Sequence, residues 1–268
     1  MEPLRVGSLT VQPFQDGVAV LEPSMFTVGD TAADWSAHAE LLDTDGLLRV
    51  PVGAFVVRTG DVTVLLDAGV GPTSDPMFSG HELIANMAAG GVAPEDIDVV
   101  FVSHCHNDHC GWLEQDGTPT FPNATIRIGA GDWTHFVDGV GGGRKRAARL
   151  RAVESRVELI DRDGEAIAPG ITTRATPGHT PGHTSAVLSS DGERMIMMGD
   201  AMHCPAQLTE SEWQFLYDVD RDLASRTRAD MLREAEAPNT MLLPAHFPGM
   251  RATRLLPAQA GPRVWSLG

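Results

Sequence analysis

The pattern of apolar and polar positions predicts a chain built mainly from short strands. Residues 4–22 alternate between apolar and polar side chains, which is typical of a strand with one buried face. Residues 47–67 do the same around a polar break at Thr59-Gly60-Asp61 and therefore predict a β-hairpin. Residues 97–102 are almost continuously apolar, which indicates a strand covered on both faces.

The rest of the chain continues this pattern and adds helices. Residues 23–46 show no clear period and predict a long loop with one short helix near 32–42. Further strands are expected at 157–160, 171–175, 184–189, 194–198 and 241–243, and helices at 82–89, 144–156 and 221–236. Strands followed by a helix and a further strand thus occur twice. We expect one domain over residues 1–268, with two β-rich halves and the helices outside.

Composition and charge narrow the possible partners. The 28 glycines and 18 prolines favour turns over a helical bundle. The formal net charge of −16 argues against nucleic acid as a partner, because phosphate backbones need a basic face. Basic residues do gather in 144–156, and we interpret them as a solvated helix face. A small-molecule substrate is therefore expected, and the sequence leaves the oligomeric state open.

The sequence also carries expectations about compartment. No apolar run approaches the roughly 18–20 residues of a membrane span. The N-terminal residues lack a basic region followed by an apolar stretch, so no signal peptide is expected. Three cysteines at scattered positions do not form a disulfide framework. A cytoplasmic location without membrane association is the resulting expectation.

A dense group of metal-ligand residue types follows the strand at 97–102. His104 and His106 are two positions apart, so both can face the same side of an extended segment. Asp108 and His109 come after the bend and can address a second point nearby. Imidazole and carboxylate ligands suit zinc, manganese or iron. The sequence therefore predicts a metal site at this strand end.

Further ligands are available at later strand ends. Two histidines, His179 and His183, lie in the run TPGHTPGH, Asp200 ends the strand MIMMGD, and His246 ends the strand MLLPAH. The residues of the 104–109 group, Asp200, His246 and one of the two TPGH histidines together provide five imidazoles and two carboxylates. That set is sufficient for two divalent ions with one bridging carboxylate.

These motifs resemble those of the metallo-β-lactamase superfamily. The resemblance rests on HxHxDH at 104–109, TPGHTPGH, GD at 199–200 and a late PAH, and it spans residues 67–246. It implies an α+β fold, a four-layer αββα sandwich with the metals at one edge between the sheets. It further implies that Asp67 orients a ligand imidazole.

The resemblance also implies a ligand assignment. His179 and His183 compete for one position, and similar sequences use the second histidine, directly before a strand. His183 is therefore predicted as the ligand and His179 as a turn residue bonded to backbone. The predicted first ion is bound by His104, His106 and His183, the second by Asp108, His109 and His246, and Asp200 bridges both.

The implied activity is that of a dinuclear metal hydrolase. Two ions, expected to be zinc with manganese or iron as alternatives, would share a hydroxide that attacks a carboxylic ester or lactone. Asp108 and His203 are the predicted catalytic residues. Aromatic side chains from three segments are candidates for lining the substrate cavity: Phe26 and Trp35, Trp133 and Phe136, and Trp213 with Phe215.

The stretches TFPNATIRIGAGDW, GDAMHCPAQ and LLPAHFPG resemble a lactonase and methyl-parathion-hydrolase-like branch. Lactonases of this branch often have a tyrosine shortly after the bridging aspartate, where this chain has His203; its one tyrosine is Tyr217. His203 is predicted to orient the substrate or donate a proton, without binding metal. Phosphotriester or thioester hydrolysis, and a mononuclear iron enzyme similar to persulfide dioxygenases, stay open as alternatives.

Overall fold

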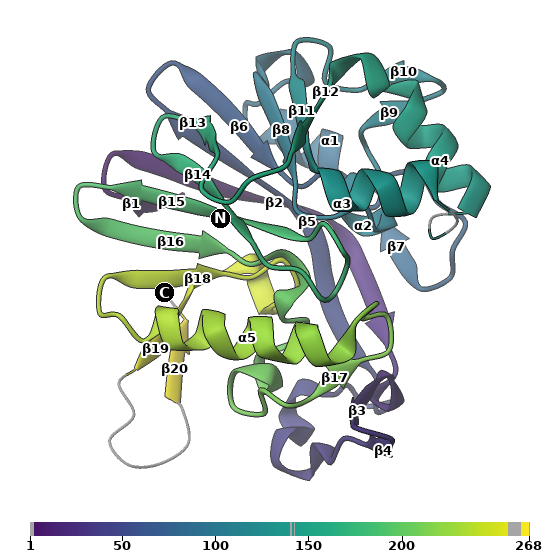
Figure 1. Ribbon diagram of the computed structural model, residues 1–268, viewed down its shortest axis with the longest axis vertical. Helices are drawn as coiled ribbons and strands as arrows, with labels where there is room; N and C mark the ends of the chain where they lie inside the picture. Colours follow the sequence, from purple (N-terminus) through teal and green to yellow (C-terminus); the bar gives the residue numbers. More distant parts are fainter. Residues whose placement is uncertain (1–2, 140, 142, 257–263, 268) are drawn as a thin grey trace.

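Two β-sheets pack face to face, with helices on their outer faces (Figure 1). The computed structural model describes residues 3–139, 141, 143–256 and 264–267. The first sheet has the order β1-β2-β5-β6-β8-β11-β12, with β7 paired to β2. Its strands are β1 (Leu4–Val6), β2 (Leu9–Leu21), β5 (Leu48–Thr59), β6 (Val62–Leu66), β7 (Phe78–Gly80), β8 (Val99–Val102), β11 (Thr125–Gly129) and β12 (Val157–Ile160).

The second sheet comes from the later part of the chain. Its order is β13-β14-β15-β16-β18-β19-β20, and these strands are β13 (Ala166–Ala168), β14 (Ile171–Ala175), β15 (Thr184–Ser190), β16 (Glu193–Met197), β18 (Thr240–Leu243), β19 (Thr253–Leu256) and β20 (Val264–Leu267). Two small sheets pair β17 (Gln214–Phe215) with β3 (Phe26–Val28) and β4 (Thr31–Ala32), and β9 (Glu114–Gln115) with β10 (Thr118–Pro119). The helices are α1 (Leu83–Ala89), α2 (Asn107–Cys110), α3 (Ala130–Trp133), α4 (Gly143–Ala152) and α5 (Arg221–Ala235).

Alternation along the strands builds the four layers. Phe55 and Val57 of β5 belong to the core between the sheets, whereas Val56 belongs to the core under the helices of the first sheet. In β16, Met197 lies between the sheets and Ile196 packs with the residues of α5. Each sheet therefore buries both faces, one against the other sheet and one against helices. The expected αββα sandwich is confirmed.

Each element predicted from the sequence has a counterpart in the structure, and the structure adds strands that were not predicted, among them β7, β13, β19 and β20. The helix expected at 144–156 ends at Ala152, and a 3₁₀ turn (Glu154–Arg156) follows it. The strand β11 was not predicted, because Arg127 interrupts its short apolar pattern. No described helix is long and apolar enough to cross a membrane.

Strand direction determines where the functional segments meet. Strand β8 runs parallel to β6 and β11, and β16 runs parallel to β18. Asp67 follows β6, His104 follows β8, Asp200 follows β16 and His246 follows β18. Because parallel strands end at the same edge of a sheet, Asp67 and His104 lie at one edge of the first sheet, and Asp200 and His246 lie at one edge of the second. The contact of His104 with Asp200 shows that these two edges meet.

Candidate metal centre and active site

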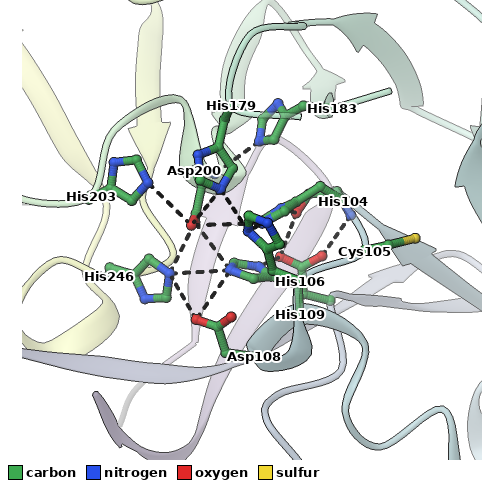
Figure 2. Close-up of polar contacts among 12 residues, drawn as sticks. His104, Cys105, His106, Asp108, His109, His179, His183, Asp200, His203 and His246 are labelled. Atoms are coloured by element: carbon green, nitrogen blue, oxygen red, sulfur yellow. Dashed lines mark hydrogen bonds and ion pairs between the residues drawn. The ribbon is translucent and has the colours of Figure 1, made fainter. Parts of the chain in front are cut away.

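The first cluster of possible metal ligands lies where β8 ends. His104 Nε2 lies 3.1 Å from His106 Nδ1, which lies 2.9 Å from His179 Nε2. Asp200 Oδ2 is 3.5 Å from His179 Nε2 and 3.8 Å from His104 Nε2. Figure 2 shows these side chains pointing toward one another, while the sulfur of Cys105 points away, as expected from strand alternation.

A second cluster shares Asp200 with the first. Asp108 Oδ2 lies 3.6 Å from both His109 Nε2 and His246 Nε2. The other carboxylate oxygen of Asp200, Oδ1, is 3.2 Å from His109 Nε2 and 3.0 Å from His246 Nε2. Asp200 thus presents one oxygen to each cluster (Figure 2).

The spacing of these atoms fits divalent metal ions. Ligands about 2.0–2.2 Å from a tetrahedral ion lie roughly 3.3 Å from one another. The distances within the two clusters scatter around this value. Asp200 Oδ1 is also a buried atom with no hydrogen bond, despite its close imidazole neighbours. Buried carboxylate oxygens normally have a partner, so a cation between the side chains explains both observations.

Three of the clustered imidazoles are anchored through their other ring nitrogen. His109 Nδ1 lies 2.7 Å from Asp67 Oδ2, His179 Nδ1 lies 2.8 Å from Asp218 Oδ1, and His246 Nδ1 lies 2.9 Å from the Pro51 carbonyl oxygen. Each of these oxygens accepts a hydrogen bond from the Nδ1 proton. The Nε2 lone pair of each ring then faces the cluster, which is the tautomer that binds metal.

Asp67 also connects the anchoring to the backbone. Its Oδ1 accepts a hydrogen bond from the Ser103 backbone N–H at 2.7 Å, and its Oδ2 accepts one from the Ser103 hydroxyl at 3.0 Å. Asp67 has a φ of 60°, in the left-handed region that aspartate and asparagine tolerate better than most residues. The expected role of Asp67 in orienting a ligand imidazole therefore has a specific geometric basis.

Replacing Asp67 with asparagine should weaken metal binding by about 10–100-fold. Asparagine retains the left-handed backbone, but only one of its side-chain atoms accepts hydrogen bonds, so Ser103 and His109 lose part of their common acceptor. Chelator competition measures the affinity. Asp16→Asn is the matched control, because Asp16 is a buried carboxylate that accepts backbone N–H bonds from Val70 and Leu83 and contacts no imidazole. Equal affinity loss in both variants would contradict the anchoring role.

His183 lies outside the clusters, which corrects the sequence-based assignment. Its Nε2 accepts a hydrogen bond from the Asp200 backbone N–H at 3.0 Å, and its Nδ1 lies 2.8 Å from the Thr176 hydroxyl. Both ring nitrogens are therefore occupied by protein groups. Strand pairing explains the difference, because β14 and β15 hold residues 176 and 183 together at the base of a loop that presents His179 at its tip.

The electrostatics of the clusters follow from burial and from Asp200. Burial lowers the pKa of His104 and His106 well below the ordinary value. Burial acts in the same direction on His109, but the Asp200, Asp108 and Asp67 carboxylates outweigh it and raise its pKa well above that value. Burial alone would raise the pKa of Asp200, yet the surrounding imidazoles hold it well below its usual range. Burial likewise opposes the charged form of His246, but the Asp200 carboxylate outweighs it and raises the pKa of that imidazole. The centre therefore combines an ionised Asp200 with two imidazoles that favour the neutral form and two that favour the charged form.

Comparison with known proteins agrees with this geometry. The family model described as the metallo-beta-lactamase superfamily matches residues 48–246. The chain belongs to the metallo-β-lactamase superfamily. The superfamily expected from the sequence motifs is thus confirmed, together with its fold and a His/Asp site suited to divalent metals.

Individual relatives of this superfamily member are distant. It is 32% identical to the N-acyl homoserine lactonase AiiB of Agrobacterium fabrum over 26% of this chain, and it spans only 32% of that relative. It is 27% identical to metallo-beta-lactamase domain-containing protein 1 of Xenopus laevis, over 79% of this chain and 78% of that protein. Its structure is similar to that of AidC, a dizinc quorum-quenching lactonase solved with a product, at 20% identity, with a TM-score of 0.85 and coverage of 99% and 96% of the two chains.

A cavity of about 230 Å³ opens onto the two clusters of this metallo-β-lactamase-superfamily chain. His106, Asp108, His179, Asp200, His203 and His246 contribute to its wall, together with apolar and aromatic side chains at Ala19, Leu21, Val50, Met77, Phe78, Phe215 and Tyr217. Of the aromatic side chains considered in the sequence, only Phe215 lines this cavity. The other five are buried in the surrounding apolar cores, as large aromatic side chains usually are.

His203 lies at the cavity wall as expected, stacked on Phe215 with ring centroids 3.9 Å apart. Both ring nitrogens are buried and have no hydrogen-bond partner, and Nε2 is 3.4 Å from Asp200 Oδ2. Burial lowers the pKa of His203 to about 3, so its imidazole is neutral at neutral pH. A neutral imidazole still donates one hydrogen bond, but it is a poor proton donor.

Two residues near the site were not identified from the sequence. Asp218 carried no motif signal, yet it is 6% exposed and anchors His179. Arg146 lines the cavity from α4, whose basic residues were interpreted as a solvated face. The helix spacing alone does not show which of its basic side chains turns toward the cavity.

Proposed function

We propose that this chain is a dinuclear metal-dependent hydrolase that cleaves a carboxylic ester or lactone, with zinc as the expected metal. The observation that carries this proposal is the placement of Asp200, which presents one carboxylate oxygen to each of two His/Asp clusters. A single ion would not need this arrangement. The curated lactonase relative supports an ester or lactone as substrate, and the apolar side chains of the cavity wall suit its acyl group.

The proposed reaction is hydrolysis by water. Divalent ions at this centre would lower the pKa of a shared water and polarise the substrate oxygen. Asp108 lines the cavity and, at 15% side-chain exposure, is more accessible than the neighbouring imidazole of His109. Its carboxylate can therefore accept the proton that water releases on adding to the carbonyl carbon. The apolar side chains at Leu21 and Met77 exclude solvent from the acyl group.

His203 is assigned a hydrogen-bonding role in this proposal. Its unpartnered N–H can bind the oxygen that gains charge as the carbonyl is attacked. His203→Ala should retain its metal and lose about 10²-fold in kcat on aryl and alkyl esters alike. Rate measurements on both ester types, with metal analysis of the same samples, test this. A loss confined to alkyl esters would instead indicate proton donation to the leaving group, and loss of metal would make His203 a ligand.

A substrate panel tests the proposed activity. Metal-loaded protein is assayed on N-acyl homoserine lactones, simple lactones, aryl esters, thioesters and phosphotriesters, with and without prior chelation. We expect kcat/KM to be highest on a lactone or carboxylic ester, and activity to disappear on chelation and return with metal. A preference for phosphotriesters or thioesters, or oxygen consumption with a persulfide substrate, would contradict the proposal and favour the corresponding alternative.

A further inference from the structure

A basic groove adjoins the proposed catalytic cavity. Its volume is about 400 Å³, and it shares Asn107 and Arg146 with the cavity wall. Its full lining is Pro72, Thr73, Ser74, Asn107, Gly143, Arg144, Lys145, Arg146 and Arg149. Four of these side chains are basic and none is acidic. The groove and the cavity therefore share part of their wall, and the basic residues of the groove come from α4.

This concentration of positive charge contrasts with the rest of the molecule. The chain has a formal net charge of −16, so its overall field repels anions. A local basic wall beside the cavity offsets that repulsion for an anionic substrate. Arg149 is partly neutralised by Glu114 at 3.7 Å, whereas Arg144 and Lys145 are exposed at the outer part of the groove. Arg146 alone among these four also lines the catalytic cavity.

The side chain of Arg146 is held in place by neutral groups. Its guanidinium lies 4.9 Å from the centre of the Phe136 ring, and its Nε donates a hydrogen bond to Asn107 Oδ1 at 3.3 Å. The Phe136 ring in turn packs against His106, with ring centroids 5.5 Å apart. Within the described part of the chain, no carboxylate lies within ion-pair distance of Arg146. The guanidinium is thus both preorganised and available for a ligand.

We propose that Arg146 binds an anionic oxygen group of the substrate, so that the enzyme prefers esters or lactones carrying a negative charge away from the scissile bond. This inference rests on the proposed hydrolase function and specifies its substrate class. A carboxylate or a phosphonate-type group can accept two parallel hydrogen bonds from the terminal guanidinium nitrogens. Arg144 and Lys145 add attraction at longer range. The apolar wall opposite α4 accommodates the uncharged part of the chain.

Matched synthetic esters test the inference. The 4-nitrophenyl ester of hexanoic acid and the mono-4-nitrophenyl ester of adipic acid have the same leaving group and chain length and differ in a terminal methyl or carboxylate. A third ester with a terminal phosphonate distinguishes the two kinds of anion. We expect wild-type protein to prefer an anionic ester over the neutral one at least tenfold in kcat/KM, mainly through KM. Added salt should reduce the preference.

Variants assign the preference to Arg146. Arg146→Gln should lower the anionic-to-neutral ratio by about tenfold or more, and Arg146→Lys should restore part of it, because lysine retains the charge but not the bidentate geometry. Arg226→Gln is the control of equal charge change, since Arg226 is exposed on α5 over the other sheet. This control should leave the ratio unchanged.

The outcomes separate this inference from the proposed function. Absence of an anionic preference, or equal losses on both esters in Arg146→Gln, would overturn the inference while neutral-ester hydrolysis still supports the hydrolase. If neither an ester nor a lactone is hydrolysed, the proposed function fails. In that case, calorimetric titration with adipate tests, independently of hydrolysis, whether Arg146 binds an anion. Weaker binding to Arg146→Gln than to wild type and Arg226→Gln would support it, and equal or absent binding would contradict it.

Discussion

Replacing Asp200 with alanine should abolish measurable hydrolysis, with kcat/KM reduced by at least about 10³-fold. Asp200 contributes an oxygen to both clusters, so its removal affects both positions at once. It is also the carboxylate around which the buried imidazoles gather, and without it their mutual repulsion is uncompensated. Metal content should fall below that of wild type, which elemental analysis of the purified variant measures.

Asp200→Asn serves as the matched control for shape. Asparagine retains the volume and one acceptor oxygen, but its NH₂ group cannot bind a cation. We expect this variant to fold and still lose activity, with at most one ion bound per chain. Two bound ions and near wild-type activity in Asp200→Asn would show that Asp200 does not bridge the clusters.

The two TPGH histidines should respond differently to replacement. His179→Ala should lose about one ion per chain and at least about 10³-fold in kcat/KM, because Nε2 of His179 belongs to the first cluster. His183→Ala should retain both ions and instead lose roughly 1–3 kcal/mol of unfolding free energy, because the Asp200 backbone N–H loses its acceptor. Metal analysis and denaturant unfolding of the two variants provide the comparison.

Wild-type protein and Thr176→Val are the controls for the His179→Ala and His183→Ala variants. Thr176 bonds His183 and contributes nothing to the clusters, so its replacement should lower stability without loss of metal. Loss of an ion only in His183→Ala would reverse the assignment made from the structure. Equal loss in both histidine variants would mean that the loop at 176–183 acts on the metals as a unit.

Much of the fold and site could be predicted from the sequence because most ligands follow strands. The apolar patterns at 97–102 and 194–198 determine strand ends, and His104 and Asp200 are located directly after them. Alternation likewise predicts that His106 faces the same side as His104 and that Cys105 does not. Where the position of a ligand residue depends on the end of a nearby strand, the sequence pattern is therefore sufficient to predict that position.

The unpredicted features depend on contacts between distant segments. The choice between His179 and His183 depends on the register of β14 and β15, which places the first at a loop tip and the second at its base. The neutral state of His203 depends on burial by segments such as Phe26 and Phe215. The inward placement of Arg146 depends on Phe136 and Asn107. None of these pairings has a periodic signal along the chain.

The central claim is that this chain binds two divalent ions through one shared carboxylate. Metal-free protein titrated with zinc tests it most directly, with bound metal and ester or lactone hydrolysis followed together. The account predicts saturation at two ions per chain, full activity only as the second ion binds, and loss of this second binding step in Asp200→Asn. Saturation at one ion per chain with full activity would contradict it.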